Sequence, residues 1–304
     1  MYDNFFNIEN EKGDVAGIKE DIGADKIKDL CLRRPEWFPN GFVYELNVSR
    51  KTLKKTEGLK RLHKWIQKAG DCGILTRQEL VSMLPPIALD PKKDDVIFDM
   101  CAAPGSKTSQ ILETIYHDFN VNNDKKLPNI YIKGAVVSND MDYKRAWMLT
   151  HQLKRINTAA MLIANHSGQF YPHLTRNDTD EGTFDKKYYF NKVLVDVPCS
   201  GDGAIRKLPN RWKWWKSLDG HNLHELQVSL LKKAIQMTKV GGSVVYSTCS
   251  LNPIENESVV TEVLRQCKNN CPGALELIDV HPIYKGFKGR PGLEKWSVLT
   301  EKKG

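Results

Sequence analysis

Two cysteines follow apolar, strand-like runs, and each is succeeded by residues typical of turns. Cys199 stands in VDVPCSGDG and Cys249 in VVYSTCSLNP. A cysteine thiolate is a nucleophile, so either residue could form a covalent bond with a substrate. A free cysteine has a pKa of about 8.5, so the attacking thiol would need surroundings that favour its charged form. Ordinary packing is the alternative, because free cysteines are often buried as small apolar side chains.

A second stretch, DMCAAPGSKT at 99–108, has the pattern of a strand end, a turn of small residues and a helix start. It lacks the glycine spacing of dinucleotide and P-loop sites, so neither NAD nor ATP is favoured. Its backbone could approach a ligand closely, and the first N–H groups of the helix could bind an anionic group. Asp140, in SNDMDYKR, could accept hydrogen bonds from two ribose hydroxyls. These features suit S-adenosylmethionine, while the alternative is a tight turn with an aspartate helix cap.

The elements that would position these residues alternate along the chain from Asp95 onward. Five apolar runs predict strands buried on both faces. They lie at 95–101, 134–140, 158–165, 192–199 and 241–249. Helical patterns fill the intervals at 106–116, 143–155, 223–238 and 254–268. This alternation predicts a doubly wound α/β domain.

Three further features refine that prediction. The helix at 254–268 would have Asn252 as its cap and Pro253 at its first position. ALELIDV at 274–280 and KWSVLT at 295–300 predict edge strands. The polar stretches 117–133 and 167–190 predict surface loops.

Residues 1–90 differ in character, and we expect a smaller α+β RNA-binding region there, ahead of a catalytic region at 91–304. FVYELNVSRK at 42–51 alternates like a strand with one exposed face. The next segment is a helix whose apolar face would contain Leu59, Leu62, Trp65 and Ile66. Between residues 50 and 68, eight Lys and Arg residues stand against one acid. These basic side chains could contact successive phosphates of an RNA, or they could simply face solvent.

Composition limits the classes of function. The 304 residues carry a formal net charge of +8, which favours a polyanionic partner such as nucleic acid. Seven cysteines without close CxxC spacing indicate reduced thiols and no structural metal site. We see neither a secretory signal nor a run of membrane-spanning length. An intracellular monomer without a membrane partner is expected, in the nucleus, the cytoplasm or both.

DMCAAPGSKT, DVPCSGDG and YSTCSLNP, in this order and spacing, resemble the signatures of the Sun-type RNA (cytosine-5)-methyltransferases. HKWIQKAGDCGILTRQELVSML and GDGAIRK…RWKWW bring the similarity nearest to the eukaryotic multisite tRNA enzymes of that family. The resemblance runs from about Val43 to Trp296. It implies a class I methyltransferase fold, S-adenosylmethionine as cofactor and RNA as substrate, with tRNA favoured.

The resemblance also implies roles for individual residues. Cys249 would attack carbon-6 of cytosine and Cys199 would assist release, while Asp196 and Lys107 would contact the base and the cofactor. Ser167, in ANHSGQF, stands where the family commonly has an aspartate, so cofactor binding would be weaker. The cofactor-binding set would be Cys101, Ala102, Ala103, Pro104, Gly105, Ser106, Lys107, Asp140, Arg145, Ser167 and Asp196.

Alternatives remain at this stage. A ribosomal RNA methyltransferase would use the same chemistry, and a non-catalytic RNA-binding factor could retain the same fold. DNA cytosine methylation is disfavoured, because those enzymes typically take the nucleophile from a Pro-Cys motif and lack the second cysteine motif. RKLPNRWKWWK at 206–216 combines Trp212, Trp214 and Trp215 with five basic residues. It could stack RNA bases, or two of its tryptophans could pack on the core.

Overall fold

The structure is a computed structural model that describes residues 33–297, apart from 42, 47, 49, 56, 123–132, 176–186 and 285. The chain divides into two compact units, which we describe separately. The first is Met1–Leu80 with His281–Lys288, and the second is Val81–Val280 with Gly289–Gly304. No helix among the described residues has the length and apolar character needed to cross a membrane.

The described residues of the first unit include two α-helices, α3 (Arg50–Lys55) and α4 (Glu57–Asp71). The amphipathic helix predicted here is confirmed: Leu59 is buried, and Leu62, Trp65 and Ile66 are partly buried. The predicted strand at 42–51 is wrong. Its described residues form only one antiparallel bridge, between Arg33 and Glu45, and the chain becomes helical at Arg50. Alternation of side chains predicts an extended segment, but a strand also requires a partner along its length.

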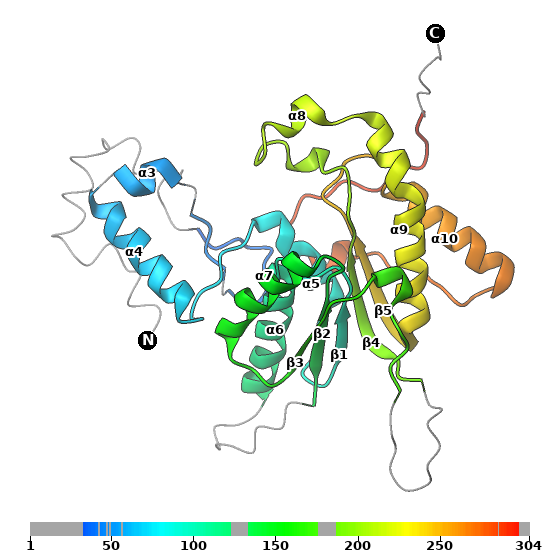
Figure 1. Cartoon of the computed structure of the whole chain (residues 1–304), viewed down its shortest axis with the longest axis horizontal. Coiled ribbons are helices and arrows are strands. Elements are labelled where there is room, and N and C mark those ends of the chain that lie inside the picture. Colours follow the sequence, from blue (N-terminus) through cyan, green and yellow to red (C-terminus); the bar gives the residue numbers. More distant parts are fainter. Residues whose placement is uncertain are drawn as a thin grey trace, which may run out of the picture. The chain divides into compact units, whose positions relative to one another are not determined.

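The second unit is built on a sheet of five parallel strands in the order β3-β2-β1-β4-β5 (Figure 1). The strands are β1 (Val96–Asp99), β2 (Ala135–Asn139), β3 (Met161–Ala164), β4 (Phe190–Asp196) and β5 (Thr238–Ser247). Each of the five predicted strands is therefore confirmed. Cys199 and Cys249 lie just beyond the ends of β4 and β5, in the loops that follow them.

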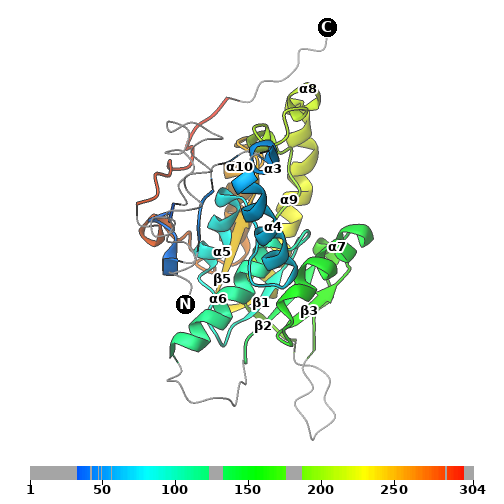
Figure 2. The same cartoon turned by 90° about the vertical axis from the view of Figure 1, so that its left-hand side faces the viewer.

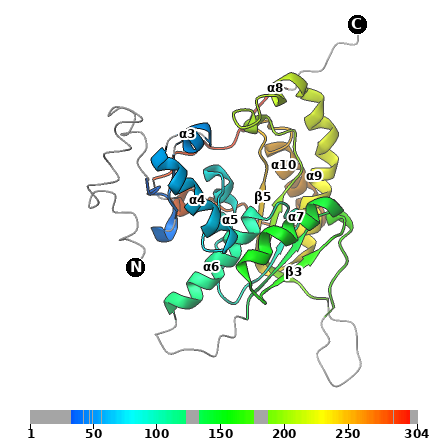
Figure 3. The same ribbon diagram turned by 60° about the vertical axis from the view of Figure 1, so that its left-hand side comes forward.

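Helices cover both faces of this sheet (Figures 2 and 3). They are α5 (Leu84–Leu89), α6 (Ser106–Asn122), α7 (Tyr143–Leu153), α9 (Ser217–Met237) and α10 (Glu257–Asn270). The short helix α8 (Arg211–Trp214) lies beyond the carboxyl end of the sheet, next to the 3-10 helix Asp202–Ala204 (Figure 1). Ile97 and Leu194 pack in one core cluster with side chains of α6 and α7, whereas their neighbours Phe98 and Val195 pack with α9. Successive strand residues point to opposite faces, which explains why these strands are apolar throughout. The doubly wound α/β prediction is confirmed.

Two boundary predictions at the end of this unit are wrong. Helix α10 begins at Glu257 with Asn256 as cap, not at Pro253. The Asn252 side chain instead accepts a hydrogen bond from the backbone N–H of Ile254 (3.1 Å), which holds 252–256 in a turn. Residues 274–280 form no strand, because no ladder pairs them with β5; Leu277 and Ile278 are exposed.

The remaining predictions fall partly outside the described residues. Residues 295–297 are not in a strand, and 298–300 are not described. Of the loop predicted at 117–133, the first part belongs to α6, which ends at Asn122. In the loop predicted at 167–190, a short 3-10 helix spans Gly168–Phe170, Thr175 bridges Lys187 and β4 begins at Phe190.

Candidate active site

The candidate site lies at the carboxyl edge of the sheet, where the loops after the parallel strands gather. The strand order changes direction at β1, whose neighbours are β2 and β4. In doubly wound sheets, ligands bind outside the carboxyl ends of the strands at such a switch point. The cofactor-loop residues follow β1, Asp140 follows β2, and the two cysteines follow β4 and β5. The fold therefore brings four separate sequence motifs to one edge.

The two cysteines form a close thiol pair. Their Sγ atoms are 3.2 Å apart, and the backbone N–H of Cys249 donates to the Cys199 sulfur at 3.3 Å. Cys249 is exposed and Cys199 is partly buried. Neither thiol is a packing residue of the core, which removes the simplest alternative to a chemical role.

The two thiols differ in acidity. The hydrogen bond from Cys199 lowers the pKa of Cys249 to about 7, and the nearby Arg211 guanidinium acts in the same direction. The same hydrogen bond, together with burial, raises the pKa of Cys199 above its ordinary value. The pair is therefore suited to a Cys249 thiolate that accepts a hydrogen bond from a protonated Cys199, and thiolates are the nucleophilic form of cysteine.

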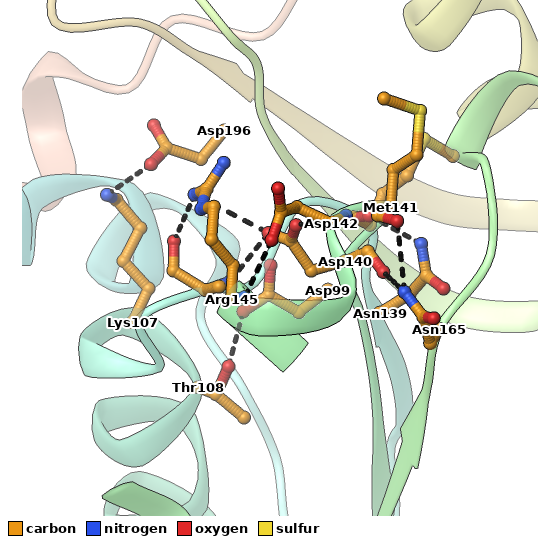
Figure 4. Close-up of polar contacts among 12 residues, drawn as sticks. Asp99, Lys107, Thr108, Asn139, Asp140, Met141, Asp142, Arg145, Asn165 and Asp196 are labelled. Atoms are coloured by element: carbon orange, nitrogen blue, oxygen red, sulfur yellow. Dashed lines mark hydrogen bonds and ion pairs between the residues drawn. The ribbon is translucent and has the colours of Figure 1, made fainter. Parts of the chain in front are cut away.

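Lys107 and Asp196 also meet at this edge (Figure 4). Lys107 Nζ, from the first turn of α6, lies 2.5 Å from Asp196 Oδ2, and Ser247 Oγ donates to Asp196 Oδ1 at 2.7 Å. Both charged side chains keep some exposure, so each can also reach a ligand. Beneath them, Asp99 is fully buried and accepts a hydrogen bond from Thr108 (2.6 Å).

Asp140 joins the loop after β2 to the loop after β1. Its Oδ2 accepts from the Ala103 N–H at 3.2 Å and lies 3.4 Å from the Arg145 guanidinium, which itself donates to the Ala103 carbonyl at 2.6 Å. Asp142, not Asp140, caps α7 through its side chain. The helix-cap alternative for Asp140 is therefore wrong, and its carboxylate serves the cofactor-type loop.

The loop at 101–106 comes close to α7 because of its small residues. Ala102 and Ala103 are buried, and Gly105 has a φ of +104°, a conformation that favours glycine. A Cβ on Gly105 would lie 2.9 Å from Leu149 Cδ1. Pro104 is exposed and Ser106 begins α6. Burial raises the pKa of the Cys101 thiol, so this cysteine is suited to packing and not to nucleophilic attack.

Sequence reasoning missed two asparagines that connect these loops. Asn139 is fully buried, donates to the Met100 and His166 carbonyls (3.0 and 2.8 Å) and accepts from the His166 N–H. Asn165 donates to the carbonyls of Asp140 and Met141 at 2.7 and 3.0 Å. Ser167, partly buried, begins the short 3-10 helix after them. Both asparagines could have been noticed in the sequence, because each is a polar residue at the end of an otherwise apolar strand.

Helix α8 lies beside the cysteine loop, and Arg211 connects the two. The Arg211 guanidinium donates to the carbonyls of Ser200 (2.7 Å) and Cys199 (3.3 Å). Trp212 and Trp214 are 76% and 72% exposed, so the alternative that two of the three tryptophans pack on the core is wrong. Trp215 is partly buried. Within the described part of the chain, no group of three or more His, Cys, Asp or Glu residues could hold a metal ion.

Fold and site together define a methyltransferase-like α/β protein of class I with a paired-thiol centre. The family of 16S rRNA methyltransferases RsmB/F matches residues 86–286. The chain therefore belongs to the RsmB/F family, the Sun-type RNA cytosine-5 methyltransferases, as its motifs predict.

Individual relatives agree with this assignment. The chain is 40% identical to a tRNA (cytosine(34)-C(5))-methyltransferase of Drosophila melanogaster, over 94% of this chain and 36% of that protein. It is 39% identical to the multisite-specific tRNA:(cytosine-C(5))-methyltransferase of Saccharomyces cerevisiae, over 88% of this chain and 37% of that protein. The chain spans little more than a third of the length of these curated relatives.

Solved structures support the fold. NSun6 from Pyrococcus horikoshii with SFG superposes with a TM-score of 0.51 and 28% identity, over 66% of this chain and 44% of that one. A methyltransferase homologue from the same organism gives a TM-score of 0.53 and 26% identity, over 84% of this chain and 67% of that one.

Proposed function

We propose that this protein methylates carbon-5 of cytosine in tRNA, with S-adenosylmethionine as the methyl donor. The observation that carries the proposal is the thiol pair, in which an exposed Cys249 of lowered pKa lies 3.2 Å from Cys199. The tRNA substrate is favoured over ribosomal RNA because the relatives at 40% and 39% identity are named as tRNA enzymes. Relatives named as ribosomal RNA enzymes are 31% and 33% identical.

The proposed chemistry needs both thiols. Carbon-5 of cytosine is a poor nucleophile until the Cys249 sulfur bonds to carbon-6, which breaks the aromaticity and places electron density on carbon-5. S-adenosylmethionine, when bound, supplies the electrophilic methyl group. A solvent water then accepts the carbon-5 proton, which restores the double bond as the sulfur–carbon-6 bond breaks and the Cys249 sulfur leaves as a thiolate. Cys199 stays protonated beside the departing sulfur and assists this release.

The other site residues would orient the base and the cofactor. Asp196 can accept a hydrogen bond from the cytosine amino group and Lys107 can donate to the ring carbonyl, while their ion pair holds both in place. The cofactor would lie beside the loop at 101–106, where the Asp140 carboxylate would accept hydrogen bonds from the ribose. Arg145 supports that loop from α7 by its bond to the Ala103 carbonyl.

RNA would also contact two basic surfaces. In the first unit, Lys51, Lys54, Lys55, Arg61, Lys64 and Lys68 are exposed. We assign residues 1–90 an RNA-binding role on the strength of this charge. In the second unit, the exposed tryptophans of α8 stand among Arg206, Lys207, Lys213 and Lys216 and would stack unpaired bases. A tRNA substrate implies work in the nucleus or the cytoplasm, where we expect the protein to act as a monomer.

Substitution of each cysteine tests the mechanism. Cys199→Ala should form the bond to RNA, methylate the base and then stall, so a slow, protease-sensitive RNA band appears on a denaturing gel. Cys249→Ala should bind RNA without this band, and the double variant should lose it. A band with Cys249→Ala alone would reverse the two roles. Methylation by both single variants would refute the two-thiol mechanism.

The substrate has its own test. Methyl transfer from labelled S-adenosylmethionine to RNA distinguishes an enzyme from a non-catalytic RNA-binding factor. Bisulfite sequencing of treated tRNA and ribosomal RNA then locates the modified cytosine. Modified positions in tRNA are expected, and modification confined to ribosomal RNA would favour the ribosomal alternative.

A further inference from the structure

Glu255 is a buried acid that the proposed chemistry does not use. It lies in the turn between β5 and α10, and its side chain is fully buried. Burying a carboxylate is costly unless hydrogen bonds compensate, so its partners explain its presence. Tyr246 fixes the backbone of this residue by donating to its carbonyl at 2.6 Å.

Four donors surround the Glu255 carboxylate. Oε1 accepts from the backbone N–H of Ser200 at 2.7 Å and from Gln227 Nε2 at 3.2 Å. Oε2 accepts from Ser200 Oγ at 2.5 Å and from Ser250 Oγ at 2.7 Å. An ionised carboxylate accepts only and has about four lone-pair positions, so this set of donors suits the charged form. Charge-assisted hydrogen bonds of this kind are among the strong ones in proteins.

The two serines bound by Glu255 each follow a cysteine directly. Ser200 comes after Cys199 and Ser250 after Cys249, so one carboxylate connects the residues beside both thiols. The loops also contact each other directly: the Gly203 N–H donates to the Cys249 carbonyl at 3.0 Å, and the Leu251 N–H donates to Asp202 Oδ1 at 2.8 Å. Glu255 adds a charged group that binds the residue after each cysteine at once. Helix α9 leaves room for the acid at Gly220, where a Cβ would lie 3.2 Å from both Glu255 Cγ and Oε2.

We infer that Glu255 is a positioning residue that sets the distance and orientation of the Cys199–Cys249 pair. This inference deepens the proposed function and rests on it for its role in turnover. The expected effect on the thiol pair does not require RNA. Without the carboxylate, the two loops lose the group that binds Ser200 and Ser250 together, and the hydrogen bond between Cys199 and Cys249 weakens. A weaker bond stabilises the Cys249 thiolate less.

The reactivity of Cys249 in the full chain, without RNA or cofactor, tests the inference. Iodoacetamide alkylation of the Cys249 peptide is followed across pH by mass spectrometry. The wild-type rate should rise with a midpoint near pH 7. Glu255→Gln puts an amide group, which is itself a donor, among the four donors. The midpoint should move up by about one unit, which makes the reaction roughly fivefold slower at pH 7. Glu262→Gln is the control: it makes the same change in α10, at a partly exposed acid paired with Arg265, and should leave the midpoint in place.

Two milder variants keep the test decisive if Glu255→Gln fails to fold. Ser200→Ala and Ser250→Ala each remove one hydroxyl donor and should shift the Cys249 midpoint in the same direction by a smaller amount. Thermal melting and S-adenosylmethionine binding verify that each protein is folded. A folded Glu255→Gln protein with the wild-type midpoint overturns the inference, and so do wild-type midpoints in both serine variants.

Turnover separates this inference from the proposed function. On tRNA, Glu255→Gln should lower kcat about tenfold or more with KM for RNA unchanged, because misplaced reacting groups slow the chemical step. A general structural defect would instead alter RNA and cofactor affinity as well. If wild-type protein methylates no RNA, the proposed function fails, whereas the alkylation profile still decides the role of Glu255.

Discussion

At the scale of single residues, Asp99 links the site to stability. It is fully buried below the Lys107–Asp196 pair, and its Oδ1 has no hydrogen-bond partner among the described residues. Burial raises its pKa to about 7, although the Thr108 hydrogen bond acts in the opposite direction. The folded protein therefore holds this proton more tightly than the unfolded chain, whose carboxyl has a pKa of 3.8.

The sign of the resulting pH effect follows from linkage. The stabilisation is fully present below pH 3.8 and is lost as pH rises through about 7. Asp99→Asn cannot ionise, so its free energy of unfolding relative to wild type should improve by on the order of a few kcal/mol between pH 5 and 8. Urea denaturation at both pH values measures this difference. A constant difference across that range would contradict the shifted pKa.

Some residues of the candidate site could be predicted from the sequence, and others could not. Cys199, Cys249, Lys107, Asp196 and Asp140 were predictable because each sits in a motif at a strand end. The structure adds the 3.2 Å contact between these two thiols, which lie fifty positions apart, and the opposite pKa shifts that it produces. No motif assigns a role to Asn139, Glu255 or Arg211, because their partners are backbone groups and serines that only the fold brings near.

At the scale of elements, helix α8 is the one whose role could not be decided from the sequence. The predicted alternatives were base stacking and core packing, and only burial distinguishes them. Trp212→Ala with Trp214→Ala should weaken RNA binding by about 1–3 kcal/mol for each stacked base, with cofactor affinity unchanged. Trp147→Ala, an exposed tryptophan of α7, is the matched control. Equal losses in both proteins, measured by filter binding, would argue against a specific platform on α8.

Helices α3 and α4 offer a separate prediction. Lys51, Lys54, Lys55 and Lys64 are exposed, whereas Lys60 is partly buried, so the exposed four are the better candidates for phosphate contacts. Replacing them with Gln should weaken RNA binding and reduce the slope of log affinity against log salt by up to about four contacts. An unchanged slope would mean that this face only meets solvent.

Element boundaries were the least predictable part of the fold. Runs of Val and Ile predicted all five strands, because strands buried on both faces need apolar side chains throughout. The start of α10 was misplaced because Asn252, a good helix cap by type, uses its side chain to close a turn instead. That turn directs Glu255 inward, so the error falls at a place where tertiary contacts override local preference.

At the scale of the whole molecule, the division into two compact units makes ligand effects separable. The residues predicted to bind the cofactor, from Cys101 to Asp196, all belong to the second unit. A ligand bound only by the native state stabilises it by mass action, by about 2.7 kcal/mol at a hundredfold excess over Kd. For a domain of this size, that gain corresponds to a rise in Tm of roughly 5–10 °C.

S-adenosylmethionine or its demethylated product should therefore raise the Tm of the transition that belongs to the second unit. Asp140→Ala removes the carboxylate bound to the Ala103 N–H and should reduce this rise, with a loss in affinity of about 1–3 kcal/mol. Calorimetry with and without ligand measures both effects, and NAD and ATP serve as controls that should leave the Tm unchanged. Stabilisation by either nucleotide at the same site would overturn the cofactor assignment. Unchanged affinity in Asp140→Ala would instead remove this residue from the cofactor site, because its carboxylate would then serve only to hold the loop.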